Sequence, residues 1–355
     1  MADQSIIQDW QVFFDERVRG RRDLVEGYLK FVKKLEETGL PPIFELRHLA
    51  EMVGIDEGVL VRIIQSPIAF YREFEIPKRL GGTRRISVPS PTVLAAQRWI
   101  LTEISSKLEI HSCCYGFVLG RSIVDNARAH LGTRVLLKLD IKDFFPSISF
   151  RQVMKIFLGA GYPVAVAYFL ARICCLNKSL PQGAATSPSL SNLVAKRLDM
   201  GLTKYPATGG LTYTRYADDL AISGEAIGST EISQIQYIVE EQGFNLNTKK
   251  TRLLQGKTQK IITGVSLSDG KLALPRRAVR EIKLEAYHLK KHGYFAHSKV
   301  KGVLDPLLME RLLGRIGFWL QIDPENVQAK RLQAEIKQYV EVVLDFRPAF
   351  CRNKL

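Results

Sequence analysis

Hydrophobic positions in the first third of the chain recur mostly at helical spacing. Apolar residues follow one another at three- and four-residue steps across residues 24–35, and a second helical pattern covers residues 44–64. This spacing predicts amphipathic helices. From residue 74 to residue 91 the pattern changes to two short runs separated by Gly81 and Gly82, which predicts a β-hairpin.

The middle third alternates between strand and helix patterns. Residues 134–140 form a short apolar run typical of a buried strand, and helical spacing follows over residues 150–157 with Ser149 as the expected N-cap. Another helix is expected after Pro188. Residues 211–223 are rich in β-branched and aromatic residues on both sides of an Asp pair, which predicts a hairpin with acids at its tip. These elements together predict a mixed α+β core.

The C-terminal segment, residues 276–355, is helical in pattern and basic. It carries 16 Lys and Arg against 9 Asp and Glu. Leucine and isoleucine recur there at helical spacing, so we expect a basic helical unit. Composition alone leaves open a helical bundle whose charges are only solvated.

The charge balance of the whole chain favours a polyanionic partner. The 355 residues carry a formal net charge of +15, and a field of this size points first to nucleic acid. No uninterrupted apolar stretch is long enough to cross a membrane and no signal-peptide pattern is present, so we expect no membrane partner and a cytoplasmic location. The cysteines lack metal-site spacing and are expected to be reduced core residues.

Two acidic positions follow apolar, strand-like runs. Asp140 ends the first run, and the adjacent pair Asp218 and Asp219 lies at the tip of the later hairpin. Neighbouring carboxylates repel one another, and a hard divalent cation is the usual compensation. Because no His or Cys accompanies these acids, Mg²⁺ suits the oxygen ligands, and two such ions could activate a hydroxyl nucleophile. The alternative is that Asp219 caps a turn and Asp140 caps the next helix.

The sequence Tyr216–Ala217–Asp218–Asp219, centred in a strand–turn–strand pattern, resembles the YADD signature of reverse transcriptases. Five further segments follow that family's order between about residues 76 and 268. The resemblance implies a right-hand polymerase with fingers, an antiparallel-sheet palm and a basic helical thumb. It also implies that Asp140, Asp218 and Asp219 are the catalytic acids and hold two Mg²⁺ ions.

The same resemblance implies roles for residues around those acids. Ile141 would lend its carbonyl to a metal ion, and Phe145 would lie beneath the sugar as a gate against a 2′-hydroxyl. Gln182, in the segment Leu-Pro-Gln-Gly, would touch the nucleotide. Lys78 and Arg84 match the residues that hold the incoming triphosphate, and their charges suit phosphate oxygens.

Lys250 follows the YADD hairpin in a segment that also resembles the family. It is a candidate to protonate the leaving pyrophosphate. A lysine in such a run can equally be only a solvated charge.

Within reverse transcriptases the resemblance is closer to the retron group. Asn126 and His130 fit the N-A-x-x-H element of retron enzymes, and Thr263 and Gly264 fit their V-T-G element, with Ile262 in place of Val. Taken alone, Asn126 and His130 would be read as a pair on one helix face.

The expected organisation has three parts. Residues 1–75 form a helical N-terminal extension, residues 76–275 form the fingers and palm, and residues 276–355 form an RNA-binding thumb. The resemblance implies that the protein copies a structured non-coding RNA into DNA from dNTPs, priming from an RNA 2′-hydroxyl to give a branched RNA–DNA product. An effector protein and a role in anti-phage defence are also implied. The alternatives are a structural RNA-binding scaffold for a toxin-like effector and a group II intron-like reverse transcriptase.

Overall fold

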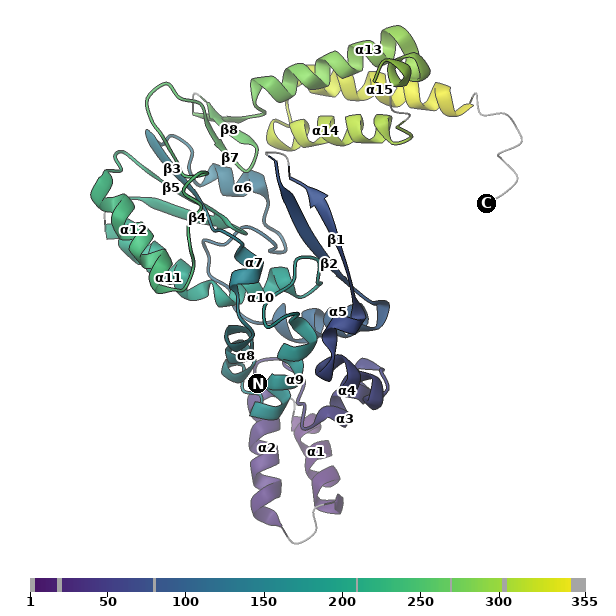
Figure 1. Cartoon of the computed structure of the whole chain (residues 1–355), viewed down its shortest axis with the longest axis vertical. Helices are drawn as coiled ribbons and strands as arrows, with labels where there is room; N and C mark the ends of the chain where they lie inside the picture. Colours follow the sequence, from purple (N-terminus) through teal and green to yellow (C-terminus); the bar gives the residue numbers. More distant parts are fainter. Residues whose placement is uncertain are drawn as a thin grey trace.

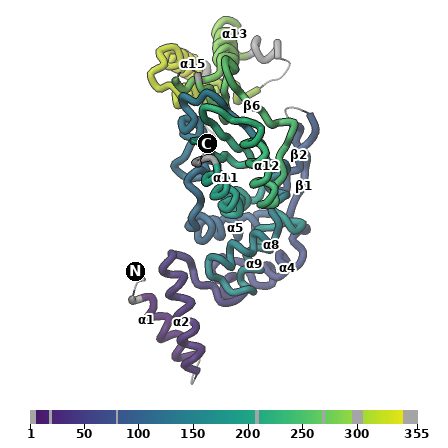
Figure 2. Tube along the Cα trace, turned by 90° about the vertical axis from the view of Figure 1, so that its left-hand side faces the viewer, coloured from purple at the N-terminus to yellow at the C-terminus, as the bar shows by residue number. Residues whose placement is uncertain are grey.

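The computed structural model describes residues 4–17, 21–78, 81–208, 210–268, 270–301 and 305–345. Helices gather at the two ends of an elongated molecule and sheets lie between them (Figures 1 and 2). This mixture of helices and antiparallel sheets confirms the predicted α+β class.

The N-terminal part is helical, as predicted. Figure 1 shows its first two helices as a stem at one end of the molecule, and a small apolar core that includes Phe14, Val25 and Val32 joins them. The predicted second helical segment is two helices, because Gly54 adopts a left-handed conformation between them. The four helices are α1 (Gln4–Arg17), α2 (Arg22–Glu36), α3 (Leu46–Val53) and α4 (Glu57–Gln65).

The predicted hairpin is present and begins earlier than expected. After a short 3₁₀ turn (Pro67–Phe70), β1 (Tyr71–Pro77) pairs antiparallel with β2 (Thr83–Pro89). Residues 79–80 at its tip lie outside the described residues. The hairpin runs along one side of the molecule and points toward α14 (Leu308–Ile322).

The central sheet, which we call the palm sheet, has the strand order β4-β5-β3-β6 and is antiparallel throughout. Its strands are β3 (Val135–Asp140), β4 (Thr212–Tyr216), β5 (Asp219–Gly224) and β6 (Arg252–Leu254). β3 is buried on both faces: Leu137 and Leu139 belong to the main core, whereas Leu136 belongs to a second core. The apolar run of β3 is therefore explained by two covered faces.

Helices of the middle third pack beneath and beside the palm sheet. The predicted Ser149 cap is confirmed, since its hydroxyl accepts the backbone N–H of Gln152 and the Gln152 side chain accepts the backbone N–H of Ser149. The helices of this part are α5 (Pro91–Ile100), continued by a π-turn (Leu101–Ser105), α6 (Ile123–Arg128), α7 (Phe144–Ser147), α8 (Phe150–Gly159), α9 (Val164–Cys174), α10 (Ser187–Val194), α11 (Lys196–Thr208) and α12 (Ser229–Glu241). Four of the five cysteines are described, and all four are buried and free, as predicted.

A second sheet connects the palm to the C-terminal helices. Its strands β7 (Lys260–Ile262), β8 (Val265–Ser268) and β9 (Lys271–Ala273) are consecutive and antiparallel. The C-terminal helices are α13 (Arg276–Lys301), α14 and α15 (Val327–Asp345), and residues 302–304 and 346–355 lie outside the described residues. One apolar core is shared by these helices, α6, the second sheet and the palm sheet.

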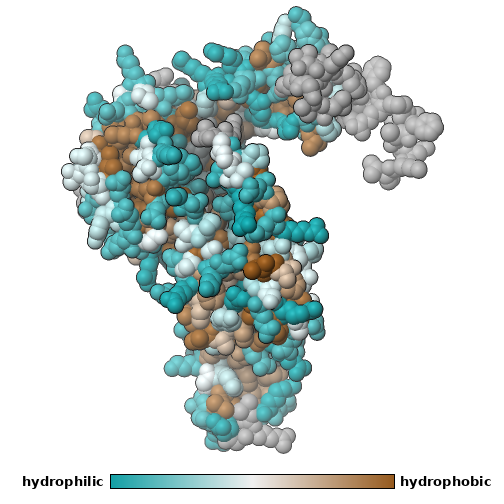
Figure 3. Space-filling view, in the orientation of Figure 1, coloured by the Kyte–Doolittle hydropathy of each residue, from teal (hydrophilic) through white to brown (hydrophobic). Residues whose placement is uncertain are grey.

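Hydrophilic side chains cover most of the C-terminal helices on the face shown in Figure 3. None of the helices in the described part of the chain is long and apolar enough to cross a membrane.

Candidate active site

The strand register brings two of the predicted acids together. Asp140, the last residue of β3, lies opposite Asp219, the first residue of β5. Directly opposite residues in an antiparallel pair have their side chains on the same face, with Cβ atoms about 5 Å apart. By the alternation of strand residues, this is the face of Leu136 and Ala221, opposite to the face that packs on the main core.

The turn between β4 and β5 holds the third acid. Ala217 has φ +57°, a left-handed conformation that is uncommon for a residue with a Cβ, and Asp218 follows it. The carbonyl of Asp218 accepts the backbone N–H of Ile141 at 2.9 Å. This bond fixes the turn against the segment that leaves β3, so all three acids lie at one end of the palm sheet.

Gly116 supports this turn, and nothing in the sequence pattern indicated it. A Cβ at Gly116 would lie 2.5 Å from the backbone nitrogen of Ala217, so only glycine allows this approach. The backbone N–H of Tyr115 donates to the carbonyl of Arg215, which places residues 113–116 beside β4. The requirement for glycine at position 116 is therefore visible only from the contact between this segment and the turn at Ala217.

Burial and mutual repulsion raise the pKa values of two acids. The pKa of Asp219 rises to about 6 because of burial and the charge of Asp218, while Lys138 opposes the shift. The pKa of Asp218 is also raised, by burial first and then by the charge of Asp140. The site therefore carries more negative charge than it stabilises by itself.

Lys250 is the cation that the structure places closest to the acids. Its Nζ donates to Oδ2 of Asp140 at 2.6 Å, and this hydrogen bond raises the pKa of Lys250. The segment that carries Lys250 is attached to the same residue, because the backbone N–H of Asn247 donates to the Asp140 carbonyl at 2.8 Å. The ammonium thus partly balances the charge of Asp140.

The donor set fits a hard divalent cation in chemistry and charge. In the described part of the chain, no three His, Cys, Asp or Glu side chains converge closely enough to hold a metal ion. The three acids nevertheless share one end of the sheet. Burial, and then the neighbouring carboxylates, disfavour the ionised forms of Asp218 and Asp219, and a divalent cation would offset this cost.

The predicted triphosphate-binding residues lie on the β1–β2 hairpin. Arg84 is opposite Ile76 in the register, and the backbone N–H of Lys78 donates to the Gly82 carbonyl at 2.9 Å. Both side chains are exposed. Arg84 is close enough to Asp218 for its charge to oppose the upward shift of the Asp218 pKa. No comparable contact places Lys78 near the acids in the described structure.

Gln182 is attached to the same hairpin. The carbonyl of Gln182 accepts the backbone N–H of Ser87 at 2.8 Å. At the next residue, Gly183 has φ +126°, and a Cβ there would lie 2.6 Å from the Ser87 carbonyl. Glycine is therefore required where this segment crosses β2.

Phe145 belongs to a small aromatic group. Its ring centroid is 6.2 Å from that of Phe117, which in turn is 6.4 Å from that of Tyr216. Phe145 is half-buried, whereas Phe117 is 49% exposed and has φ +60°. Phe117 thus connects the predicted sugar gate to Tyr216, the first residue of the YADD segment.

Two of the retron-type residues, Thr263 and Gly264, lie on the contact between the second sheet and α6. Thr263 and Gly264 form the two-residue turn between β7 and β8, with φ of +46° and +88°. Positive φ at both positions is the pattern of a type I′ hairpin, and it strains a β-branched residue such as Thr263. The Thr263 hydroxyl donates to the carbonyl of Ile123, the first residue of α6, at 3.2 Å.

Asn126 and His130 are both buried, but they are not a helix-face pair, because α6 ends at Arg128. The two ring nitrogens of His130 lie 2.7 Å from the hydroxyls of Ser223 and Thr214. His130 therefore joins β4 to β5. The side-chain oxygen of Asn126 is buried, and no described residue donates a hydrogen bond to it.

Burial of His130 makes stability depend on pH. Its pKa falls from 6.5 to about 4 because of desolvation, so the folded state keeps it neutral. We expect this residue to contribute about 3 kcal/mol to the free energy of unfolding above pH 6.5, lost as the pH falls toward 4. Urea unfolding of the wild type and of His130→Gln should therefore give a stability difference that shrinks on acidification. A difference that stays constant with pH would contradict this prediction.

A buried ionic network, absent from the sequence predictions, holds β4 beneath the acids. Arg215 and Asp199 are fully buried, and the guanidinium donates to the two carboxylate oxygens at 2.7 and 2.6 Å. Arg215 also donates to the side chain of Asn192 at 2.9 Å and to the carbonyl of Ala217 at 3.3 Å. Asn192 in turn donates to the Gly116 carbonyl at 2.8 Å. The network thus connects α10 and α11 to the YADD turn.

Comparison with known proteins agrees with this arrangement. Residues 76–270, more than half of the chain, match the family described as Reverse transcriptase (RNA-dependent DNA polymerase). The chain is therefore an RNA-directed DNA polymerase with the right-hand fold of that family. It uses an RNA template, makes DNA, and belongs to an enzyme class that depends on divalent metal.

The relatives define the subgroup. The chain is 32% identical over 261 residues to the retron Ec86 reverse transcriptase of Escherichia coli, covering 72% of this chain and 81% of that protein. It is 33% identical over 339 residues to the retron Mx65 reverse transcriptase of Myxococcus xanthus, covering 85% and 78%. It is 32% identical over 341 residues to the retron Mx162 reverse transcriptase of the same organism, covering 84% and 68%. Within its family the chain belongs to the retron reverse transcriptases.

Proposed function

We propose that this enzyme copies part of a structured non-coding RNA into DNA and begins from a 2′-hydroxyl of that RNA, so that the product is branched. The observation that carries the proposal is the contact of Thr263 with Ile123. It attaches the turn that holds Thr263 and Gly264 to the first residue of α6, the helix that carries Asn126. The similarity to retron reverse transcriptases supports it.

In this proposal Asp140, Asp218 and Asp219, with the carbonyl of Ile141, hold two Mg²⁺ ions. Bound there, the ions would lower the pKa of the attacking hydroxyl and offset the charge of the triphosphate. The clustering of the acids at one end of the palm sheet supports this assignment.

The side chains around the acids bind and orient the nucleotide. Lys78 and Arg84 bind phosphate oxygens, which suits their exposed charges on the hairpin. Gln182 positions the nucleotide, and Phe145 excludes a 2′-hydroxyl from the sugar site. Lys250 transfers a proton to the leaving pyrophosphate.

Variants of Lys250 separate proton transfer from charge compensation. Lys250→Met removes the cation from Asp140, so the Mg²⁺ concentration for half-maximal activity should fall about fivefold, equivalent to ~1 kcal/mol between charges about 4 Å apart in water. Lys250→Arg keeps the charge but holds its proton more tightly, so kcat should fall about a hundredfold at an unchanged Mg²⁺ requirement. Primer extension across an Mg²⁺ titration measures both. Wild-type kcat in Lys250→Arg would remove the proton-transfer role.

The three parts of the chain have separate tasks in the proposal. Residues 76–275 carry the fingers and palm, residues 276–355 form a thumb that binds RNA, and residues 1–75 form a helical extension. The proposal places the enzyme in the cytoplasm, where its RNA substrate and dNTPs are present. An effector protein that acts with it in defence against phage belongs to the same proposal and rests on the retron resemblance.

The linkage in the product tests the proposal directly. Nucleic acid that copurifies with the full-length enzyme should contain DNA joined to RNA through a 2′,5′ bond, which resists alkali at the branch and is cut by a debranching enzyme. DNA that is joined only to an RNA 3′ end would overturn the branching proposal. A protein that carries RNA and incorporates no nucleotides with Mg²⁺ would instead be a scaffold.

A further inference from the structure

Phe117 is a strained and exposed aromatic residue to which the proposed function assigns no task. Its φ of +60° lies in the left-handed region, which is unfavourable for a residue with a bulky side chain. Its ring is 49% exposed, and it belongs to none of the three apolar cores in the described part of the chain. Strained residues of this kind persist where the surrounding structure fixes them, and they gather at active sites.

The loop that carries Phe117 is fixed on both sides of this residue. Before it, Gly116 packs against the backbone of Ala217 so closely that no Cβ fits between them. After it, the Arg121 guanidinium donates to the carbonyl of Cys114 at 2.5 Å, which closes the loop. The loop therefore holds Phe117 in its strained conformation.

The strand register places Tyr216, a neighbour of Phe117, on the face of the palm sheet that carries two of the acids. Tyr216 lies opposite Asp219 in the β4–β5 pair, so their side chains share one face. Asp140 is on this face as well, because it lies opposite Asp219 in the β3–β5 pair. The centroid of the Phe117 ring is 6.4 Å from that of Tyr216, within the distance at which aromatic rings interact. Phe117 therefore borders the candidate active site.

The Phe117 ring also lies beside the predicted sugar gate. Its centroid is 6.2 Å from that of Phe145, and the two ring planes are inclined at 41°. Phe145 and Tyr216 are both half-buried, so the three rings together offer a partly exposed apolar surface. Burying a hydroxyl against apolar rings without a hydrogen bond costs free energy, so this surface favours a deoxyribose over a ribose.

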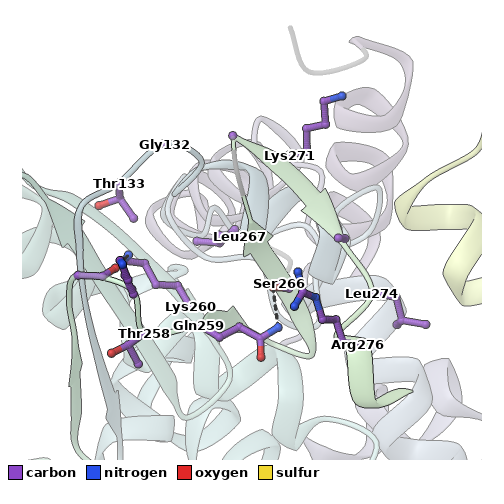
Figure 4. A pocket seen from close by; sticks show the side chains of 14 residues that line it. Gly132, Thr133, Thr258, Gln259, Lys260, Ser266, Leu267, Lys271, Leu274 and Arg276 are labelled. Atoms are coloured by element: carbon purple, nitrogen blue, oxygen red, sulfur yellow. Dashed lines mark hydrogen bonds between the residues drawn. The ribbon is translucent and has the colours of Figure 1, made fainter. Parts of the chain in front are cut away.

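The hollow between the second sheet and the start of α13 does not offer such a surface. Its volume is about 750 Å³, and none of the described residues that line it is aromatic (Figure 4). Two of its polar side chains are engaged within the chain, because Thr133 donates to the Val135 carbonyl at 2.8 Å and Gln259 donates to the Ser266 hydroxyl at 3.1 Å. The hollow also adjoins the end of β3 remote from Asp140, since Thr133 lies just before that strand. It is therefore not the place where the sugar is selected.

We propose that Phe117 is a specificity-determining residue for the sugar of the nucleotide, and that its ring packs beside Phe145 and disfavours a ribose at the reaction centre. The inference rests on the proposed function, in which the sugar is selected at Phe145. It deepens that function, because the sugar is then selected by two rings from segments that are distant in the sequence. The strained backbone of Phe117 is the cost of presenting a bulky ring to the substrate from a short, fixed loop.

Two variants that remove the ring separate selectivity from stability. Phe117→Ala keeps the strained backbone, whereas Phe117→Gly relieves the strain, since glycine adopts a positive φ at no steric cost. Phe117→Tyr keeps the ring, and Leu119→Ala is the matched control, at a fully exposed apolar position in the same loop. The measurement is kcat/KM for one dNTP and for the matching rNTP, with the full-length enzyme, an RNA template, a DNA primer and Mg²⁺. Thermal unfolding of each variant gives its stability.

Phe117→Ala and Phe117→Gly should each lose about tenfold in the preference for the dNTP, a size typical of one apolar contact in a binding pocket. Phe117→Gly should nevertheless be the more stable of the two. Phe117→Tyr and Leu119→Ala should keep the wild-type preference. An unchanged preference in both variants without the ring would overturn the inference. So would a loss in Phe117→Ala that is absent from Phe117→Gly, because the residue would then act only on the fold.

Phe145→Ala tests the proposed sugar gate separately. A loss of preference in Phe145→Ala, with none in the two Phe117 variants that lack the ring, would keep the gate of the proposed function and overturn the inference. A loss in those Phe117 variants, with none in Phe145→Ala, would support Phe117 as the determinant of sugar selection and overturn the assignment of Phe145.

Discussion

Asp218→Asn should reduce DNA synthesis by at least about a thousandfold and leave the fold intact. The substitution keeps the size of the side chain but removes one of three negative charges at the end of the palm sheet. Loss of one such electrostatic group at a reaction centre typically costs two to three orders of magnitude, and loss of metal binding adds to this. Single-turnover primer extension with saturating Mg²⁺ and dNTPs measures the effect.

Whereas activity should fall in Asp218→Asn, the stability of the fold should be unchanged or higher. Because burial and Asp140 raise the pKa of Asp218, its ionisation is less favourable in the folded protein than in the unfolded chain. Without metal, Asp218→Asn should therefore unfold at the same temperature as the wild type or at a higher one. Asp143→Asn, at an exposed position nearby, is the matched control and should retain activity. Normal polymerisation by Asp218→Asn would refute the site.

Arg215→Met should be the most destabilising single change in the palm, at about 3–5 kcal/mol. It leaves the fully buried Asp199 carboxylate without its cation, and breaking one side of a buried pair costs this much because the remaining charge is uncompensated. Urea unfolding measures the loss. Combining Arg215→Met with Asp199→Asn removes the charge as well, so about 2 kcal/mol or more should return.

Activity of the double variant separates stability from positioning. The double variant keeps a neutral interior but cannot donate to the Ala217 carbonyl, so the YADD turn loses one of its supports. We expect kcat to fall while KM for dNTPs changes little. Wild-type kcat in the folded double variant would limit Arg215 to a structural role, and an Arg215→Met single variant as stable as the wild type would contradict the ionic network itself.

Much of the fold followed from local pattern, because the elements concerned are specified locally. The apolar run of β3 and the hairpin around Asp218 and Asp219 were predicted from residue types alone, and the Ser149 cap from one side chain. The pairing of Asp140 with Asp219 needed the strand register, which the pattern of one strand does not contain. The nearness of the acids was therefore expected only through the family resemblance.

The missed residues depend on contacts between distant segments. Arg215 lies between Thr214 and Tyr216 in β4, and a charged residue in a strand is usually expected to face solvent. It is nevertheless fully buried, because α11 supplies Asp199. Gly116 is constrained by the backbone of a turn much later in the chain.

The apolar core that the C-terminal helices share with the palm limits how such enzymes can be recombined. Ile282 and Leu312 lie in one cluster with Leu136 of β3 and with Ile262 and Val265 of the second sheet. In a chimaera that replaces the C-terminal segment from residue 276 onward, the apolar side chains of the new helices would therefore pack poorly against the palm and second sheet of this chain. When a C-terminal segment is exchanged between two relatives to change RNA preference, folding should succeed more often if the crossover precedes β7. The second sheet and the C-terminal helices that pack on it then come from the same protein.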